Sequence, residues 1–367
     1  MYARSSEKND GSIGMDKNIT VATMQFKNDV KVSTTEYLKT YYTFKLGDIA
    51  FEGHQSKEFR YGRFVENDIG NGIVSHIFAV FRPIQEYDLY FWKYAINNET
   101  LMQRILARST KASTMMHDLV TNDFLNETFL VPSVKEQKQI GAFLNKLDNI
   151  ITLHQRKCEQ TKNLKKYMLQ KMFPQNGAKV PEIRFNGFTH DWEQRKLGDV
   201  FKEYSEKNHT ELSALTIIQG GGTVKREDSD RNLMYDTSNL SNYKMVRKDD
   251  FIVHLRSFEG GLEKSSLDGI ISPAYHTFHS DMADSRFYYP YFRSYEFIKH
   301  KLVSHVYGIR DGRSIDIDGM KTIEIPYTSI EEQRKIGDYL DCLDHLITLH
   351  QRQTDFYKKI SFYYISS

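Results

Sequence analysis

The chain has 367 residues, of which 40% are hydrophobic and 27% are charged, and its formal net charge is +2. This balance is typical of a globular protein with two or three domains, and it argues against a disordered chain. A nearly neutral chain gives little support for nucleic-acid binding, but it does not exclude it, because local patches matter more than the sum.

The cysteines and the N-terminal stretch predict a cytoplasmic protein. Cys158 and Cys342 are the only cysteines, too few for a disulfide framework, so a reducing compartment is the simpler interpretation. Residues 1–14 contain no apolar core typical of a signal peptide. No run approaches the roughly 20 apolar residues that span a bilayer.

The first 131 residues predict a mixed lobe of strands and helices, called lobe one. A β-like stretch at residues 73–81 follows the turn signal Asn71-Gly72. Residues 87–97 have helical character. Lobe one is therefore expected to be α+β.

Residues 132–174 predict a long helix. Pro132 precedes its start, and Ser133 is followed three residues later by Glu136. This is a capping box, in which the two side chains satisfy free amides of the first helical turn. The helix is expected to continue to about Met172.

Residues 175–325 predict a second mixed α+β lobe, called lobe two. A helical stretch is expected at residues 288–303. The β-like stretches are at residues 251–255, 270–278 and 322–325.

Residues 326–367 repeat the first helix. Residues 133–156 and 329–352 are identical at 14 of 24 positions with a constant offset of 196, and both end in ITLHQR. The chain is therefore lobe, helix, lobe, helix, with a pseudo-twofold internal repeat. The second helix is expected to run to about Ile360.

Both helices carry an apolar stripe with the 4-3-4 spacing of a coiled coil. The stripe and the histidine at its next position are Ile140, Leu144, Leu147, Ile151 and His154, matched by Ile336, Leu340, Leu343, Ile347 and His350. We predict that the helices pair as an antiparallel coiled coil between two separate lobes. A buried helix pair inside one domain is the alternative. The two histidines are interpreted as polar seam residues that fix the register rather than as metal ligands.

This layout resembles the specificity subunit of type I restriction–modification systems, in which two target-recognition domains alternate with two conserved helical regions. The resemblance covers nearly the whole chain. It is carried by the segments PSVKEQKQIGAFLNKLDNIITLHQRK and TSIEEQRKIGDYLDCLDHLITLHQRQ, and by PEIRFNGFTHDWEQRKLGDVF at residues 181–201.

The resemblance implies a non-catalytic subunit that binds double-stranded DNA. Each lobe would read one half of a bipartite, asymmetric target, and the helices would dock two methyltransferase subunits. Restriction/translocase subunits would join that core. The resemblance implies no cofactor in this chain, because other subunits of the complex would use S-adenosylmethionine, ATP and magnesium.

Two features depart from this layout. Residues 192–199 (WEQRKLGD) have no counterpart in lobe one, because projecting them back by about 200 residues falls before residue 1. Lobe one is therefore expected to be short at its N-terminal side. The similarity of the helices also ends after Arg352. A truncated or recombined allele and a first lobe completed by another polypeptide are both open interpretations.

The resemblance supplies no residue code for the target, because recognition domains differ with their targets. Basic and aromatic residues in expected loops are the candidates, since Arg and Lys contact phosphates and Arg also reads guanine. The candidates are His54, Lys57, Arg60, Tyr61, Arg63, Arg104, Arg108 and Lys111 in lobe one, and Lys225, Arg226, Arg231, His254, Arg256, Tyr307, Arg310 and Arg313 in lobe two. A solvated surface charge is the alternative for each.

Two stretches are singled out among the basic segments. The string YGIRDGR at residues 307–313 is favoured, because its glycines let a basic loop approach a DNA backbone closely. Between Arg156 and Lys171 the first helix has six basic residues and one acid. A solvated helix face and a docking face for an acidic partner or DNA are both open there.

A search for catalytic motifs identifies none. There is no phosphate-binding loop, and Gly220-Gly221-Gly222 lacks dinucleotide-binding spacing. The string SPAY at residues 272–275 lacks the amide and the second proline of adenine methyltransferases, and no Cys/His cluster has zinc spacing. We therefore predict a non-catalytic DNA-recognition subunit. A protein-binding scaffold is the alternative, and an independent nuclease or methyltransferase is the third candidate.

Overall fold

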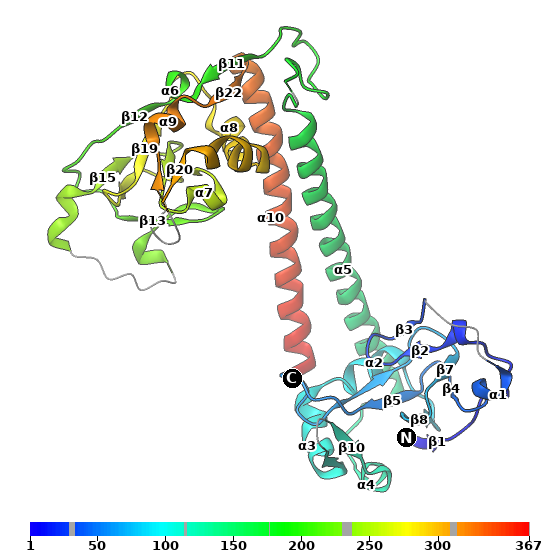
Figure 1. The fold of residues 1–367 in the computed structure, drawn as a ribbon. Helices are drawn as coiled ribbons and strands as arrows, with labels where there is room; N and C mark the ends of the chain where they lie inside the picture. Colours follow the sequence, from blue (N-terminus) through cyan, green and yellow to red (C-terminus); the bar gives the residue numbers. More distant parts are fainter. Residues whose placement is uncertain (29–33, 114–115, 176, 230–236, 309–313, 367) are drawn as a thin grey trace. The chain divides into compact units, whose positions relative to one another are not determined.

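The structure, a computed structural model, describes residues 1–28, 34–113, 116–175, 177–229, 237–308 and 314–366 (Figure 1). The chain divides into two compact units. Unit one comprises Met1–Arg156 and Gln351–Ser367, and unit two is Lys157–His350. Each unit therefore holds one lobe together with a stretch of both long helices.

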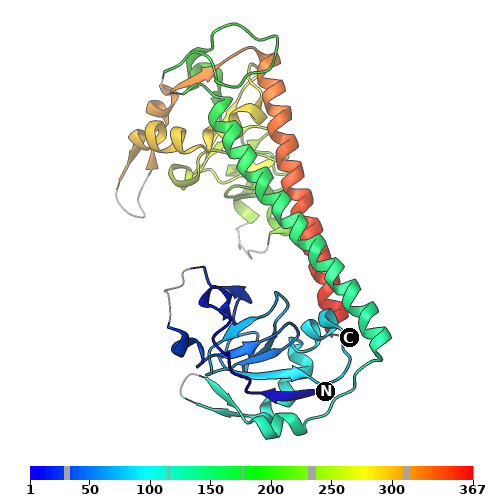
Figure 2. The same ribbon diagram turned by 90° about the vertical axis from the view of Figure 1, so that its right-hand side faces the viewer.

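A four-stranded antiparallel sheet with the order β1-β8-β5-β6 forms the centre of lobe one (Figure 2). Successive residues of its central strand β5 point to opposite faces. Ile49 and Phe51 join one buried cluster with Trp92, and Ala50 joins another. The elements of lobe one are β1 (Tyr2–Ser5), η1 (Met15–Lys17), β2 (Ile19–Thr20), β3 (Gln25–Phe26), α1 (Thr35–Leu38), β4 (Tyr42–Phe44), β5 (Ile49–Glu52), β6 (Arg63–Glu66), β7 (Gly72–Val74), β8 (Ala79–Pro83), α2 (Leu89–Ala95), α3 (Glu99–Ser109), β9 (Thr110–Ala112), β10 (His117–Leu119) and α4 (Thr121–Asn126).

Lobe two is built on the matching antiparallel sheet β12-β19-β16-β17. Its core is rich in aromatic side chains, among them Phe251, Phe287 and Phe292. The elements are β11 (Glu193–Lys196), α6 (Leu197–Val200), β12 (Lys202–Tyr204), β13 (Leu215–Ile218), β14 (Gly222–Lys225), η2 (Arg226–Asp228), η3 (Thr237–Asn242), β15 (Lys244–Val246), β16 (Phe251–Val253), α7 (Ser257–Gly260), β17 (Glu263–Lys264), β18 (Gly269–Ile271), β19 (His276–His279), α8 (Ser285–Phe292), the π-helix η4 (Glu296–Leu302), η5 (Val303–His305), β20 (Val306–Tyr307), β21 (Ser314–Ile315), α9 (Ile317–Lys321) and β22 (Glu324–Tyr327).

The strand register shows that the two sheets are copies of one another. In lobe one Phe81 lies opposite both Arg4 and Ile49. In lobe two Phe278 lies opposite both Glu203 and Phe251. The internal repeat therefore extends from the helices into the sheets.

Lobe two has one strand pair that the described residues of lobe one lack. Strand β11 pairs with β22 directly before the second long helix. The corresponding stretch of lobe one, residues 127–131, is irregular backbone.

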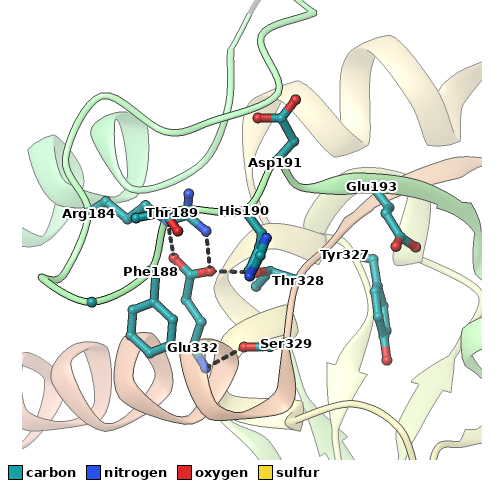
Figure 3. Close-up of a pocket in the computed structure, with 11 residues that line it drawn as sticks. Arg184, Phe188, Thr189, His190, Asp191, Glu193, Tyr327, Thr328, Ser329 and Glu332 are labelled. Carbon is teal, nitrogen blue, oxygen red and sulfur yellow. Dashed lines mark hydrogen bonds and ion pairs between the residues drawn. The ribbon is translucent and has the colours of Figure 1, made fainter.

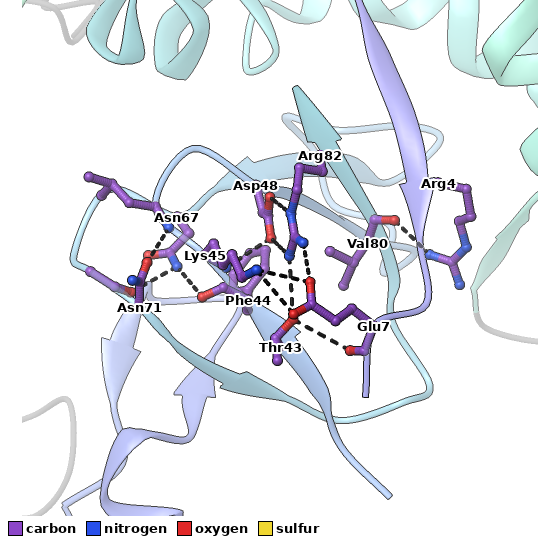
Figure 4. Close-up of polar contacts among 12 residues, drawn as sticks. Arg4, Glu7, Thr43, Phe44, Lys45, Asp48, Asn67, Asn71, Val80 and Arg82 are labelled. Atoms are coloured by element: carbon purple, nitrogen blue, oxygen red, sulfur yellow. Dashed lines mark hydrogen bonds and ion pairs between the residues drawn. The ribbon is translucent and has the colours of Figure 1, made fainter. Parts of the chain in front are cut away.

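The buried turn before each central strand is held by an aspartate. In lobe one the carboxylate of Asp48 accepts the amide of Lys45 over 2.8 Å and the guanidinium of Arg82 over 2.9 and 2.8 Å (Figure 4). In lobe two Asp250 accepts the Arg247 amide over 3.2 Å and lies 2.5 Å from Nδ1 of His279. The two lobes thus stabilise the same turn with different basic side chains, Arg82 and His279.

Some predicted elements are divided in the structure. The stretches 73–81 and 270–278 are each two strands joined by a turn, in which the Phe78 amide donates to Ser75 and the Tyr275 amide to Ser272. The expected helix at residues 288–303 is interrupted between α8 and η4. The two turns begin at Ser75-His76 and Ser272-Pro273, which interrupt otherwise mostly apolar stretches.

The two long helices are α5 (Val134–Lys171) and α10 (Ile330–Ser366). Each begins with the expected serine cap, because the Glu136 and Glu332 amides donate hydrogen bonds to the side-chain oxygens of Ser133 and Ser329. At 1.5 Å per residue, α5 is about 57 Å long. Helix α10 runs beyond the expected end near Ile360.

The two helices pair in antiparallel fashion, side by side in both views (Figures 1 and 2). In unit one the ring of His154 stacks on Tyr357 with centroids 6.0 Å apart. In unit two Nζ of Lys165 lies 2.6 Å from the carboxylate of Asp344. Partner numbers fall along α10 as they rise along α5, which confirms the antiparallel arrangement.

The apolar stripe is buried at most of its positions, with one departure. Leu144, Leu147 and Ile151 of α5 are buried, as are Ile336, Leu340 and Leu343 of α10, whereas Ile347 and the two histidines are half-buried. Ile140 departs from the predicted seam because it is 40% exposed, although its counterpart Ile336 is 1% exposed. The described residues of unit one place nothing over Ile140 comparable to the cluster that covers Ile336.

Each lobe is joined to its helix by the same polar contact. The side-chain oxygen of Gln137 accepts the amide of Asp88 over 3.2 Å, and its nitrogen donates to the Pro132 carbonyl. Gln333 accepts the Asp284 amide over 3.0 Å in the same way. These glutamines are buried, so they fix the start of each helix against its own lobe.

Candidate nucleic-acid interface

In lobe one, the loop between β5 and β6 lies against the hairpin β9–β10. The amide of His117 donates to the Gly53 carbonyl over 2.8 Å, and His54 pairs with Met116 in an isolated β-bridge. A Cβ at Gly53 would lie 2.1 Å from the His117 carbonyl oxygen, so this approach requires glycine. The contact places the loop that carries His54 beside the hairpin that carries Lys111.

Aromatic contacts hold part of this loop in place. The Arg60 guanidinium lies 5.6 Å from the ring centroid of Tyr61, and that ring meets His117 edge-on at 5.3 Å. Arg63 donates to Glu52 over 2.8 Å and to the Ala22 carbonyl over 2.8 Å. Arg63 is therefore part of the lobe's own hydrogen-bond network.

The other basic candidates of lobe one divide by their partners. Arg108 donates to the carboxylate of Glu127 over 2.8 Å. Lys57, Arg104 and Lys111 are exposed, and none forms an ion pair within the described part of the chain. Exposed cations without a carboxylate partner are the ones best able to replace counterions on DNA phosphates.

In lobe two the basic candidates are dispersed. Arg226 lies at the end of β14, 5.2 Å from the ring centroid of Tyr243, and Lys225 is 3.7 Å from a Glu227 oxygen. Arg256, just before α7, is exposed and has no ion pair among the described residues. Tyr307 is 59% exposed on β20.

His254 lies near Arg256 and Arg293 but does not itself carry a positive charge. Burial lowers its pKa to about 4, and the charges of Arg293 and Arg256 act in the same direction. The imidazole is therefore neutral at neutral pH. A contact from it to DNA would be a hydrogen bond or packing.

Three candidates lie outside the described residues: Arg231, Arg310 and Arg313. The expected approach of the loop 307–313 to DNA therefore rests on its sequence alone. The strands β20 and β21 on either side of it pair, as β9 and β10 do in lobe one.

The basic stretch of α5 is partly used within the fold. Lys165 pairs with Asp344, and Lys171 pairs with Glu182. Lys157, Lys162 and Lys166 are exposed in unit two, and Lys162 and Lys166 lie one turn apart on the same side of the helix.

The structure also contains a buried polar site at the start of α10, which sequence reasoning missed (Figure 3). Glu332 is 0% exposed, and its carboxylate receives two hydrogen bonds from Arg184, at 2.6 and 2.8 Å, and one from Nε1 of Trp192 at 3.1 Å. Phe188 and His190 help to line a cavity of about 280 Å³ beside it. Thr328 also donates to this carboxylate. Because Arg184 and Trp192 both belong to the linker and hold a buried carboxylate of α10, we interpret the site as an attachment of the linker to the helix.

One signal in the sequence could have revealed both polar contacts. The pair Glu-Gln recurs in both helix copies, as Glu136-Gln137 and Glu332-Gln333. Both glutamines of these pairs are buried, but only one of the two glutamates is, so the repeated pair signals the lobe–helix contact and does not identify the partners of Glu332. Among the residues that the structure describes, no helix combines the length and apolar character needed to cross a bilayer.

Comparison with known proteins gives consistent matches. A family model described as the type I restriction modification DNA specificity domain matches residues 3–163 and 189–355. The type I restriction enzyme MjaVIII specificity subunit of Methanocaldococcus jannaschii is 26% identical over 289 residues, which cover 73% of this chain and 66% of that protein. The putative MjaX specificity subunit of the same organism is 23% identical over 369 residues, covering 93% and 80%. The chain thus spans just under two thirds of the first relative.

One solved structure supports the same fold, and a second is similar at a lower score. The S subunit of a type I restriction–modification system from M. genitalium has a TM-score of 0.55 at 15% identity, with 100% of this chain and 92% of that chain covered. The HsdS subunit from Thermoanaerobacter tengcongensis has a TM-score of 0.47 at 16% identity, with 100% and 95% covered.

The two segments matched by the family model contain both sheets and most of both long helices, in the order lobe, helix, lobe, helix. The chain therefore belongs to the type I restriction–modification DNA specificity family, and it carries two copies of the specificity domain.

Proposed function

We propose that this chain is the non-catalytic DNA-recognition subunit of a type I restriction–modification complex in the cytoplasm. Lobe one, residues 1–131, and lobe two, residues 175–325, each read one half of a bipartite, asymmetric DNA target. The helical segments 132–174 and 326–367 dock two methyltransferase subunits, and restriction/translocase subunits join them. Those subunits supply the adenine chemistry with S-adenosylmethionine, ATP and magnesium.

The observation that carries the proposal is the duplicated sheet, with a different set of side chains on each copy. The register of the two sheets is the same. Among the described candidates, the exposed cations without an ion pair are Lys57, Arg60, Arg104 and Lys111 in lobe one and Arg256 in lobe two. A shared scaffold with different surface groups is what reading two unlike half-sites requires.

The test is co-expression of the chain with a type I methyltransferase subunit, followed by single-molecule sequencing of the host DNA. We expect adenine methylation at a split, asymmetric motif. Exchanging residues 190–325 for another recognition lobe should change one half-site only. A change in both halves would contradict the modular assignment. A stable complex without methylation would indicate a defective allele, and the absence of any complex would favour the scaffold alternative.

The basic residues are tested by the salt dependence of DNA binding in the assembled complex. Alanine at Lys57, Arg104 or Lys111 should each reduce the slope of log affinity against log salt by about 0.9 if the residue contacts a phosphate. Arg108→Ala is the matched control, because Glu127 already pairs with that guanidinium. Equal slopes for all four variants would remove these residues from the interface.

A further inference from the structure

Five positions of unit one are exposed although their counterparts in unit two are covered. We call these positions the open face: Leu130, Val131, Glu136, Ile140 and Phe143. Leu130 is 99% exposed, and Phe143 is 42% exposed although its ring meets Tyr364 of α10 edge-on at 5.1 Å. The counterparts, 196 residues later, are Pro326, Tyr327, Glu332, Ile336 and Tyr339, all of them buried or half-buried. Nearly identical helix starts therefore present an uncovered surface in one unit and a covered surface in the other.

In unit two the covering is made by the segment from Ile183 to Leu197. Strand β11 of this segment pairs with β22, and the Arg195 guanidinium lies 3.7 Å from the ring centroid of Tyr327. The ring of Phe185 meets Tyr339 edge-on at 6.1 Å. This segment thus covers the counterparts of Leu130, Val131 and Phe143 together.

The covering segment is fixed by charge as well as by packing. Arg184 and, eight residues later, Trp192 both donate to Glu332. Within the described residues, the hydrogen bonds of the Glu136 side chain are to Ser133 alone. The carboxylate of Glu136 is therefore free to accept a guanidinium without losing its place in the helix cap.

A buried donor in lobe one points to the same missing contact. Trp92 is 1% exposed, and its Nε1 has no hydrogen-bond partner among the described residues. Its counterpart Tyr288 donates its hydroxyl to the Pro326 carbonyl over 2.9 Å. Pro326 lies on β22, the strand that β11 holds in place. The equivalent carbonyl in lobe one belongs to Leu130, which no strand holds.

We propose that the open face binds a segment of another polypeptide with the chemistry of residues 183–197. The segment has an arginine, a tryptophan eight residues later, and a β-strand directly after it. Its strand pairs with residues 128–131, its arginine pairs with Glu136, and its apolar side chains cover Ile140 and Phe143. Main-chain pairing of this kind gives affinity, and the side chains at alternate positions give specificity.

The proposal is independent of the DNA-recognition function. A second copy of this chain is not the occupant, because its own residues 183–197 are already used in its unit two. That alternative is nevertheless an outcome of the experiment.

The experiment uses the full chain and a dye-labelled synthetic peptide of residues 181–201. Fluorescence anisotropy should show saturable binding at one peptide per chain. Peptides with Arg184→Ala or Trp192→Ala should bind more weakly. In the chain, Glu136→Gln should weaken binding by about tenfold or more, since it removes a charge-assisted hydrogen bond. Glutamine retains the capping box, so the helix start stays intact. Glu331→Gln, at an exposed position of α10, is the matched control and should change nothing.

Hydrogen exchange locates the peptide. Amides of residues 128–131 should become protected when the peptide is added, while those of β22 stay unchanged. No saturable binding would overturn the proposal, as would binding that Glu136→Gln leaves unaffected. Altered protection at β22 would place the peptide in unit two and also overturn it. A dimer of the chain alone that Glu136→Gln dissociates would make a second copy the occupant, against the proposal.

Discussion

The glutamates at the start of the two long helices have opposite surroundings. Glu332 is completely buried and bound by Arg184 and Trp192, whereas Glu136 is exposed and bound only to Ser133 among the described residues. The sequences around them are nearly the same. The local motif therefore specifies the helix cap in both copies, but a segment almost 150 residues earlier in the chain decides whether the carboxylate is buried.

The largest expected effect comes from replacing each of these two glutamates with alanine. Glu332→Ala leaves the guanidinium of Arg184 largely buried without its carboxylate, which typically costs about 3–5 kcal/mol. Glu136→Ala removes only a cap contact in water and should cost less than about 1 kcal/mol. Denaturant unfolding of both variants measures the difference. Equal losses of unfolding free energy in the two variants would mean that the buried hydrogen bonds of Glu332 do not stabilise the chain.

A second comparison concerns matched positions on the edge strands β6 and β17. Lys264 pairs with Asp249 over 2.8 Å, whereas both carboxyl oxygens of Glu66 are buried with no partner among the described residues. Burial raises the pKa of Glu66 to about 9. Because the folded pKa lies above the unfolded value, its contribution is fully present below about pH 4.5 and is lost as pH rises towards 9.

Glu66→Gln should therefore stabilise lobe one at neutral pH, by up to about 3 kcal/mol at 1.36 kcal/mol per pH unit. The variant should also lose the decline in stability between pH 4.5 and 9 that is expected of the parent chain. Thermal unfolding across this pH range, followed by hydrogen exchange at β6, checks both. If the stability of Glu66→Gln depended on pH in the same way as that of the parent chain, the carboxyl of Glu66 would not be buried in its protonated form.

The two lobe–helix joints differ in how closely the backbone packs. A Cβ at Gly141 would lie 2.2 Å from Oδ1 of Asp88 and 2.6 Å from the Phe91 amide nitrogen, but a Cβ at Gly337 would lie 3.1 Å from Cβ of Arg286. Gly141→Ala should therefore destabilise by about 1–3 kcal/mol through overpacking. Gly337→Ala should leave the free energy of unfolding nearly unchanged. The higher helix propensity of alanine contributes about 1 kcal/mol, which offsets the tight contact between the added Cβ and Arg286. The reverse order in unfolding experiments would show that the joints are not packed as described.

The smallest expected effect concerns the basic side chains that bind the two turn aspartates, Arg82 at Asp48 and His279 at Asp250. The hydrogen bond to Asp250 raises the pKa of His279, whereas Arg82 stays charged. The contribution of the protonated imidazole is present below its unfolded pKa of about 6.5 and is lost as pH rises through the higher folded value. Exchange of the β16 amides should therefore speed up more with rising pH than exchange of the β5 amides, after correction for intrinsic rates. His279→Arg should abolish the difference, and a difference that persists would exclude this cause.

Sequence reasoning could predict the parts of this fold that depend on local pattern. The serine caps of both helices, the antiparallel seam and the two α+β lobes follow from spacing within a few turns or from the repeat. The reciprocal half of the capping box forms at Ser133 and Glu136, whereas the carboxylate of Glu332 binds Arg184, Trp192 and Thr328. The exposure of Ile140 could not be predicted, because its environment depends on a covering segment that lies far away in the chain. The neutral state of His254 could not be predicted either, because it results from burial and from Arg293 nearby. The DNA-contacting residues stay predictions, since a basic residue in a loop has the same sequence pattern whether or not a carboxylate has paired with it.

The division of the long helices between the two compact units has a consequence for the order of folding during synthesis. Unit two is one continuous stretch, Lys157–His350, so all of its contacts are available once that stretch has left the ribosome. Unit one needs Gln351–Ser367 beside a helix segment made some 200 residues earlier. Loop closure over such a separation is slow compared with local contacts. The N-terminal lobe, although translated first, therefore completes its helix pairing last, and its half of the seam is exposed to chaperones for most of translation.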